Sequence, residues 1–274
     1  MELTYKIGWY HSKPPMRLPL VFGVLVAIAV AAVVTGQAQA PPPPAPLMVF
    51  AAADLGPPFK QIVPQFERKT RAAVTLVLGS TGTLAQQIRN GAPADLFFAA
   101  NESFVKDLAS ENLTLRQTQT VYARGRVATV SLKASGVRIE ALSDLANPKI
   151  RRIAIANPQH APYGLAARQA LEASGLWGTV EPKLVFGENV QQAVQFVRSG
   201  SAEAGLVARS VADTSDLHWK LVDDRLHAPL NQMAVVLART KQPGASMSFI
   251  EFVNSAQGRF VMRQFGFLLP GESF

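Results

Sequence analysis

The amino-acid sequence predicts an α/β protein with two lobes, each a mainly parallel sheet covered by helices, and a cleft between the lobes. From Leu47 onward, short apolar runs alternate with stretches whose apolar residues recur at helical spacing. This pattern is typical of parallel strands joined by helices. It begins again after about residue 125, which indicates a second unit of the same kind. A chain of 274 residues is long enough to bury two such cores.

Residues 47–124 are predicted to form the first part of lobe 1. The runs LMVFAA, AAVTLVLG and ADLFFAA are short and apolar, as buried strands are. Each run is followed by apolar residues that would share one face of a helix. These residues are Phe59, Ile62, Val63 and Phe66 after the first run, Leu84, Ile88 and Gly91 after the second, and Phe104 and Leu108 after the third.

Residues 125–230 repeat the pattern as lobe 2, and residues 231–274 are predicted to return to lobe 1. Lobe 2 contains the strand runs VATVSL, RRIAIA and KLVF, with a helix after the second run and another after the third. The return segment holds the strand MAVVLA. A helix follows it with apolar residues at positions i, i+3, i+4 and i+7, namely Phe249, Phe252, Val253 and Ala256.

Residues 1–40 carry the three-part pattern of a signal peptide. Basic residues precede an apolar run from Leu18 to Val34, and small residues ending at Ala40 match the site that a signal peptidase cuts. We expect cleavage after Ala40, export to the periplasm, and an extended Pro-rich spacer over residues 41–46. Two alternatives stay open, since the apolar run is close to the length of a membrane anchor and Met16 could be the true start.

Composition excludes several classes of site. The chain has no Cys, so disulfides, thiolate zinc sites and a cysteine nucleophile are ruled out. The net charge of +8 is spread along the chain without an aromatic and basic stripe, so no nucleic-acid partner is predicted. Neither a phosphate-binding loop ending in Lys nor a G-x-S-x-G nucleophile turn occurs. Three histidines, His160, His218 and His227, are too scattered for a metal motif, and we expect neither a metal site nor a catalytic residue.

Four predicted strand-to-helix turns are rich in small or capping residues. They are Ala51–Leu55, Gly79–Thr83, Asn157–Gly164 and Phe186–Val190. In a parallel sheet such turns lie together at the carboxyl edge, where free backbone N–H groups at helix starts favour anions. Each turn taken alone is also explained by ordinary helix capping. Asp95, at the start of a buried strand, is expected to make a structural hydrogen bond to backbone.

Several blocks of the mature sequence resemble the periplasmic molybdate-binding proteins of ABC importers, which are type II periplasmic binding proteins. The blocks are VFAAADL, LGSTGTLAQQIRNGAPADLFFAA, IAIANPQHAPYGLAARQAL, FGENVQQAV, AEAGLVA and FGFLLPGE. The resemblance implies a non-enzymatic, monomeric protein without a cofactor, whose two lobes close over a tetrahedral oxyanion. Molybdate or tungstate would be the ligand, and a membrane permease would receive it.

The resemblance also implies which residues bind the ligand. Hydroxyl groups would come from the turn that holds Ser80 and Thr81, and backbone N–H groups from Tyr163 and Val190. Two positions depart from the family pattern. A serine hydroxyl is replaced by the carboxylate of Asp54, and a tyrosine is replaced by Ala208, which offers no side-chain donor.

Asp54 poses the main electrostatic difficulty, because a carboxylate 4 Å from one unit of negative charge costs about 4 kcal/mol at a dielectric constant near 20. Four explanations stay open: the side chain caps its own helix, it is protonated, a cation such as Arg124 pairs with it, or the ligand is a protonated oxyanion. The last would favour a phosphate-like ion over sulfate. An alternative function in the same fold is a metal-cation site built from Asp54, His160 and Tyr163.

Overall fold

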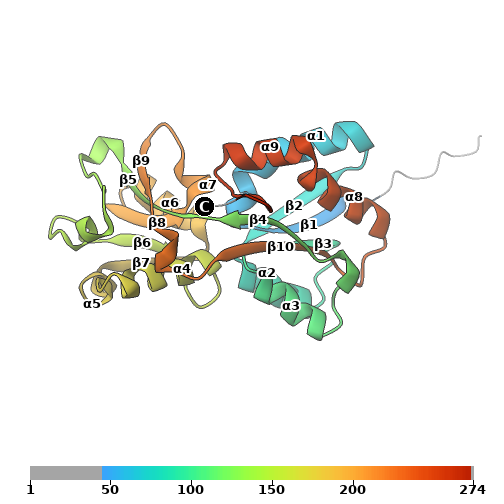
Figure 1. Cartoon of the computed structure of the whole chain (residues 1–274), viewed down its shortest axis with the longest axis horizontal. Coiled ribbons are helices and arrows are strands. Elements are labelled where there is room, and N and C mark those ends of the chain that lie inside the picture. Colours follow the sequence, from blue (N-terminus) through green and yellow to red (C-terminus); the bar gives the residue numbers. More distant parts are fainter. Residues whose placement is uncertain (1–44, 273–274) are drawn as a thin grey trace, which may run out of the picture. The chain divides into compact units, whose positions relative to one another are not determined.

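The computed structural model describes residues 45–272, which contain two five-stranded sheets (Figure 1). Both sheets lie within one compact unit that begins at residue 43. The signal-peptide and cleavage predictions for residues 1–40, and most of the spacer over 41–46, lie outside the described residues. Among the residues that are described, no helix has the length and apolar character needed to cross a bilayer.

The first sheet has the strand order β2-β1-β3-β10-β4. Strands β1, β2 and β3 pair in parallel, whereas β10 runs antiparallel to both β3 and β4. The sheet is therefore mixed, with one strand against the direction of the other four. The bounds are β1 Leu47–Ala52, β2 Val74–Gly79, β3 Leu96–Ala99, β4 Thr120–Gly125 and β10 Leu230–Val236.

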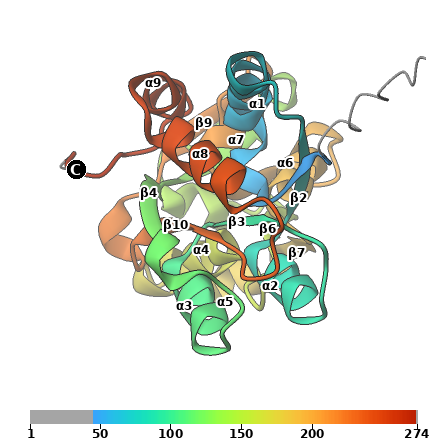
Figure 2. The same ribbon diagram turned by 90° about the vertical axis from the view of Figure 1, so that its right-hand side faces the viewer.

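Two layers of helices cover this sheet, as the end-on view shows (Figure 2). Alternate residues of β1 face opposite layers: Val49 and Ala51 pack into one apolar cluster and Phe50 into the other. In the first cluster the ring of Phe59 packs edge-on against those of Phe98 and Phe249. The covering helices are α1 Gly56–Thr70, α8 Pro243–Asn254 and α9 Ala256–Gln264 on that side, and α2 Thr81–Arg89 and α3 Glu102–Ser110 on the other.

The second sheet repeats the same plan in the order β7-β6-β8-β5-β9. Strands β6, β7 and β8 pair in parallel, and β5 runs antiparallel to β8 and β9. Its elements are β5 Val127–Leu132, β6 Ile153–Ala156, β7 Leu184–Gly187, β8 Ala204–Ala208 and β9 Leu217–Leu221, with α4 Pro162–Ala173, α5 Trp177–Val180, α6 Val190–Arg198 and α7 Arg209–Ala212.

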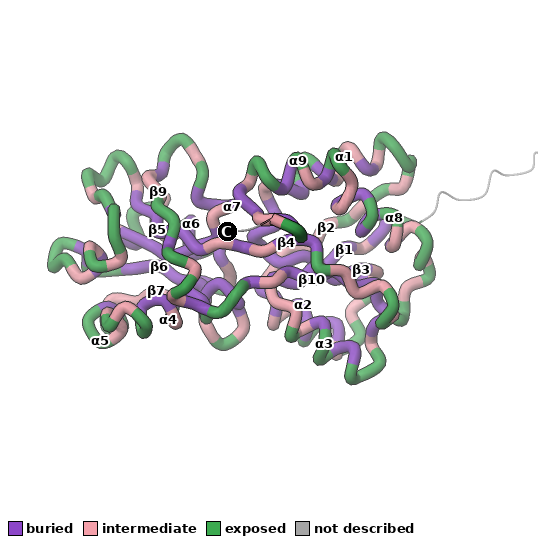
Figure 3. Tube along the Cα trace, in the orientation of Figure 1, coloured by how far each residue is buried: buried purple, intermediate pink, exposed green. Residues whose placement is uncertain are grey.

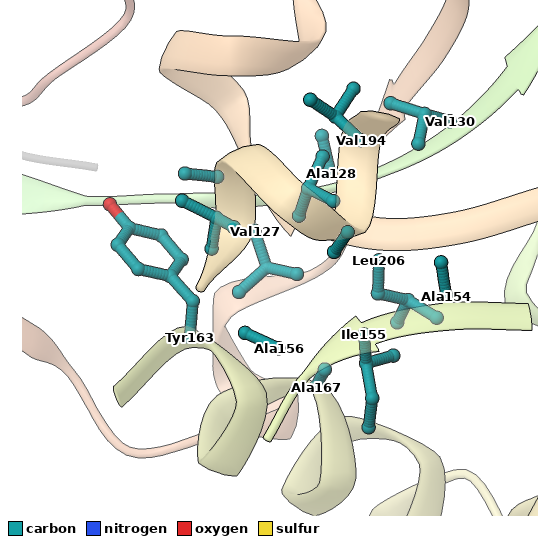
Figure 4. Packing of buried hydrophobic residues seen from close by; sticks show 14 of the residues in the cluster. Val127, Ala128, Val130, Ala154, Ile155, Ala156, Tyr163, Ala167, Val194 and Leu206 are labelled. Atoms are coloured by element: carbon teal, nitrogen blue, oxygen red, sulfur yellow. The ribbon is translucent and has the colours of Figure 1, made fainter. Parts of the chain in front are cut away.

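The core of the second sheet is aliphatic. Strands β6 and β8 are buried along their whole length because helices cover both faces (Figure 3). Small and β-branched side chains from the strands meet those of α4 and α6, including Ala167 and Val194 (Figure 4). Short 3₁₀ turns complete the described chain at Ala53–Leu55, Arg116–Thr118, Lys133–Ser135, Leu142–Ala146, Glu181–Lys183 and Asp224–Leu226.

The chain passes from one sheet to the other through two short connections. Strand β4 ends at Gly125 in the first sheet and β5 begins at Val127 in the second, so one residue separates them. The return runs from the end of β9 to the start of β10. Strands β4, β8 and β9 are not among the strand runs predicted from the apolar pattern. The predicted structural role of Asp95 is confirmed, since its carboxylate accepts the Met48 N–H at 2.8 Å.

Candidate ligand-binding site

A small cavity lies where strand-to-helix turns of the two sheets meet. The volume open to the centre of a water-sized sphere is about 10 Å³, which is roughly the space that one water needs. All of the residues predicted to bind a ligand line this cavity. The lining consists of Ala52, Ala53, Asp54, Gly79, Ser80, Thr81, Ala100, Ala161, Pro162, Tyr163, Asn189 and Val190.

The turn after β2 places two buried hydroxyl groups at the cavity. Ser80 caps α2, since its Oγ accepts the Thr83 N–H at 3.3 Å, and it also lies 2.7 Å from His160 Nδ1. Thr81 Oγ1 accepts the Ala100 N–H at 3.1 Å. Because that bond uses a lone pair of Thr81, its hydroxyl hydrogen remains available to donate to a ligand.

Two helices of the second sheet begin at the same cavity. Tyr163 and Val190 lie in the first turns of α4 and α6, where backbone N–H groups have no partner within their own helix. Asn189 caps α6, with its Oδ1 accepting the N–H groups of Gln191 and Gln192. The partial positive charge of each helix start therefore faces the cavity wall.

Asp54 is buried, with only 1% of its surface exposed, and its carboxylate binds neutral groups. Oδ2 accepts hydrogen bonds from the Tyr163 hydroxyl at 2.9 Å and from Gln232 Nε2 at 2.5 Å. Oδ1 is buried and has no hydrogen-bond partner among the described residues. The suggestion that Asp54 caps its own helix is wrong, because neither the 3₁₀ turn nor α1 has a side-chain cap. The suggested cation, Arg124, donates its Nε to Asn231.

Burial raises the pKa of Asp54 to about 6. The hydrogen bonds from Gln232 and Tyr163 lower this pKa, but by less than burial raises it. Nearby backbone N–H groups of residues 54 and 55 lower it further, although neither makes a hydrogen bond of ordinary geometry with the carboxylate. Burial also raises the pKa of the Tyr163 phenol well above its usual value, and the charge of Asp54 adds to this. The Tyr163 phenol therefore stays protonated and donates a hydrogen bond to Asp54.

Gln232 is the main site residue that sequence reasoning missed. It lies on β10, is completely buried, accepts the Tyr122 hydroxyl at 2.7 Å, and contacts the Tyr163 hydroxyl at 3.0 Å. Asp54 and Gln232 of the first sheet thus bind Tyr163 of the second. A polar residue inside the apolar run LNQMAVV was the available signal.

Other hydrogen bonds join the two sheets around the cavity. Gln191 Nε2 donates to the Ala53 carbonyl at 2.7 Å, and Ser210 Oγ donates to the Asp54 carbonyl at 2.7 Å. The Gly82 N–H donates to the His160 carbonyl at 2.8 Å. Ala208, where the family pattern has a tyrosine, ends β8 and is fully buried. The wall is therefore held together by polar contacts from both sheets.

The predicted alternative of a metal-cation site finds no support in this geometry. Asp54 and Tyr163 bind each other, while His160 binds Ser80. Within residues 45–272, no group of three or more His, Cys, Asp or Glu side chains is placed to hold a metal ion. The cavity wall is instead formed by hydroxyl groups, helix starts and one buried carboxylate.

Residues 47–268 match the family of bacterial extracellular solute-binding proteins. The chain belongs to this family. It is 34% identical to the molybdate-binding protein ModA of Azotobacter vinelandii over 226 residues, which cover 81% of this chain and 89% of that protein. It is 31% identical to ModA of Rhodobacter capsulatus over 219 residues, covering 79% and 86% of the two chains.

Solved structures of similar proteins have the same fold. The Azotobacter vinelandii periplasmic molybdate-binding protein matches with a TM-score of 0.77 and 30% identity, over 82% of this chain and 99% of that one. The substrate-binding domain of a molybdenum ABC transporter protein from Clostridium difficile, itself described as putative, matches with a TM-score of 0.63 and 28% identity. That match covers 81% of this chain and 98% of the other. The resemblance stated from the sequence, and the two-lobed binding-protein fold that it implies, are confirmed.

Proposed function

We propose that this protein is the substrate-binding component of an ABC importer and captures a tetrahedral oxyanion, molybdate or tungstate, for delivery to a membrane permease. The observation that carries this proposal is the meeting of hydroxyl groups and helix starts from both sheets around one buried cavity. The molybdate-binding relatives, which align over most of their own length, support the same ligand class.

Oxyanion binding in this site uses neutral donors. The first sheet contributes the hydroxyl of Thr81 and that of Ser80, whose hydrogen must turn from Thr83 Oγ1 to the ligand. The N–H groups of Tyr163 and Val190 come from the second sheet. Such groups stabilise negative charge without a basic side chain, because they are fixed in a buried setting of low dielectric constant. The cavity has room for about one water, and a four-oxygen anion is larger than one water, so its entry requires the turns of the two sheets to move apart.

The same geometry argues against catalysis. Ser80 and His160 come closest to a nucleophile and base, but the serine caps α2 and also donates to Thr83 Oγ1 at 2.8 Å. The carboxylate nearest the other imidazole nitrogen, that of Glu188, lies 3.9 Å from it and is largely exposed. We propose that the protein is not an enzyme and needs no cofactor. Turnover of phosphate or acyl esters above the buffer rate would contradict this.

Export and assembly state complete the proposal. The chain acts as a monomer in the periplasm after cleavage behind Ala40. Mass spectrometry of the chain recovered from the periplasm of an expressing cell gives its N-terminus, and light scattering gives its assembly state. A chain that keeps its first forty residues and stays in the membrane fraction would contradict the cleavage, but it would leave the binding function standing.

Thermal unfolding with a panel of ions tests the ligand class. Molybdate and tungstate are expected to raise the melting temperature in a concentration-dependent way, since a ligand that binds only the folded state stabilises it. Sulfate, phosphate and divalent metal ions serve as comparisons. A rise with divalent metals alone, or no rise with any tetrahedral oxyanion, would overturn the proposed function.

A further inference from the structure

We propose that the site captures its oxyanion together with one proton from solvent, held between Asp54 Oδ1 and an oxygen of the ligand. This inference rests on the proposed function and deepens it, because it sets which oxyanions the site prefers. It follows from the position, burial and partners of the Asp54 carboxylate.

The two oxygens of Asp54 differ in their surroundings. Oδ2 already receives two hydrogen bonds, from Tyr163 and Gln232. Oδ1 is buried without a partner, in a residue that lines the cavity. A carboxylate oxygen offers only lone pairs, and so does an oxygen of molybdate. The two can lie side by side without strong repulsion only if a hydrogen atom lies between them.

The groups packed around Asp54 leave its negative charge uncompensated by a bonded cation. Tyr163 of α4 and Gln232 of β10 bind the carboxylate, and both are neutral. Ser210 of α7 and Gln191 of α6, also neutral, donate to the backbone carbonyls of Asp54 and Ala53. Burial and the charge of Asp54 raise the pKa of Tyr122 on β4 well above its usual value, so this neighbouring phenol is neutral too. Arg124, on β4, donates to Asn231, and Arg126, between β4 and β5, donates to the Gly266 carbonyl. The backbone N–H groups of residues 54 and 55 also lie near the carboxylate, and they are neutral as well.

The ease of protonation agrees with this geometry. Burial raises the pKa of Asp54 to about 6 before any ligand is present. A dianion nearby disfavours the ionised carboxylate further and raises this pKa again. At a pH between the pKa of Asp54 in the free protein and its higher pKa in the complex, Asp54 is ionised in the free protein and protonated in the complex. Binding therefore takes up a proton at neutral and mildly alkaline pH.

A shared proton selects among oxyanions. Molybdate and tungstate have oxygens basic enough to share one with a carboxylic acid, whereas sulfate is a much weaker base. Monohydrogen phosphate brings its own proton and needs none from solvent. A site that held its ligand with hydroxyl and amide donors alone would have no such preference against sulfate.

Isothermal titration calorimetry at pH 6, 7 and 8, in buffers with different heats of ionisation, measures the protons taken up per ligand bound. The wild-type protein is expected to take up close to one proton per molybdate at pH 7 to 8. Its affinity should fall by up to about tenfold per pH unit in that range. Monohydrogen phosphate, if it binds, should do so at pH 8 with little uptake, and sulfate should bind at least tenfold more weakly than molybdate.

Asp54→Asn tests the assignment to this residue. Its oxygen can still accept from Tyr163 and Gln232, and its NH₂ group can donate to the ligand without a solvent proton. Proton uptake should disappear, and affinity at pH 8 should exceed that of the wild type. Glu188→Gln, which alters an exposed carboxylate close to the cavity, should keep the uptake, and so should His160→Gln. Melting curves without ligand establish that each variant is folded.

The outcomes separate the two proposals. If no tetrahedral oxyanion binds the wild-type protein, the proposed function fails. If molybdate binds without proton uptake, or if Asp54→Asn keeps the full uptake, oxyanion binding stands and the shared proton is wrong. Loss of uptake in His160→Gln but not in Asp54→Asn would place the proton on the imidazole and would equally overturn this inference.

Discussion

Tyr163 and Asp54 lie 109 residues apart in the chain, and the hydroxyl of the first donates a hydrogen bond of 2.9 Å to the carboxylate of the second. Tyr163 begins α4 beside the second sheet, and Asp54 follows β1 of the first. The tyrosine ring packs beside Val127 with its oxygen turned away from the aliphatic cluster (Figure 4). This bond connects the two sheets through the wall of the candidate binding cavity.

Tyr163→Phe should weaken ligand binding while leaving the backbone donor of residue 163 in place. It removes a hydrogen bond that joins the two sheets around the closed cavity, a loss of about 1 to 3 kcal/mol that disfavours closure over the ligand. Because this bond also lowers the pKa of Asp54, its loss should not abolish proton uptake. We expect oxyanion affinity to fall about 5- to 150-fold by calorimetry. Tyr122→Phe is the matched control, because its hydroxyl binds Gln232 within the first sheet. A larger loss of affinity in Tyr122→Phe than in Tyr163→Phe would contradict a bridging role for Tyr163.

Gly125→Ala should disturb the hydrogen bond between Tyr163 and Asp54, because the Gly125 backbone lies against the Tyr163 hydroxyl. A Cβ atom at this position would lie 2.0 Å from the Tyr163 hydroxyl oxygen and 2.8 Å from Gln232 Nε2. Relief of this overlap requires the phenol to move, at a cost of about 1 to 3 kcal/mol in unfolding free energy. Urea denaturation and calorimetry should show lower stability and weaker binding together. Gly178→Ala, whose added Cβ would meet nothing within 4 Å, is the control and should be near neutral.

Thr81→Ala should lower oxyanion affinity by about 3- to 10-fold, because it removes one hydroxyl donor of roughly 1 kcal/mol from the cavity wall. It also leaves the Ala100 N–H without its acceptor, so the melting temperature should fall slightly. Thr81→Ser keeps the hydroxyl and separates the two effects. Serine should restore most of the affinity. Equal affinity of the alanine variant and the wild type would show that Thr81 does not touch the ligand.

The strand-to-helix turns were predictable from sequence because their signals are local. A strand followed by a capping residue such as Ser80 or Asn189 places a helix start at the sheet edge, whatever the rest of the chain does. The five site residues that the family resemblance implies all line one cavity at these turns. Strands β4 and β9, with the sequences TVYARG and LHWKL, escaped detection because polar and charged residues interrupt their apolar pattern.

The partners of Asp54 could not be predicted in the same way. Gln232 reaches it from β10, 178 residues later in the chain, and Tyr163 reaches it from the other sheet. Which polar groups meet a buried carboxylate depends on how two separately formed sheets pack, and no local spacing encodes that. The capping prediction for Asp54 failed for this reason, since a local rule was applied to a residue whose contacts are long-range.

Asp54 should also make the ligand-free protein less stable as pH rises from about 4 to 6. Its pKa in the folded state is about 6, against an ordinary value of 3.8 for an aspartate side chain. The folded protein therefore binds more protons than the unfolded chain in this range, and stability falls as pH increases. This pKa difference of about two corresponds to about 3 kcal/mol of unfolding free energy lost above pH 6, with no loss below pH 4.

Asp54→Asn removes the ionisable group, so its unfolding free energy should exceed that of the wild type at pH 8 and approach it at pH 4.5. Urea denaturation of both proteins at the two pH values measures this difference, and taking the difference cancels the opposite trends of exposed carboxylates such as Glu272, whose pKa is lowered by hydrogen bonds. A difference between variant and wild type that stays constant from pH 4.5 to 8 would mean that Asp54 titrates alike in the folded and unfolded states, and its burial would then carry no electrostatic cost.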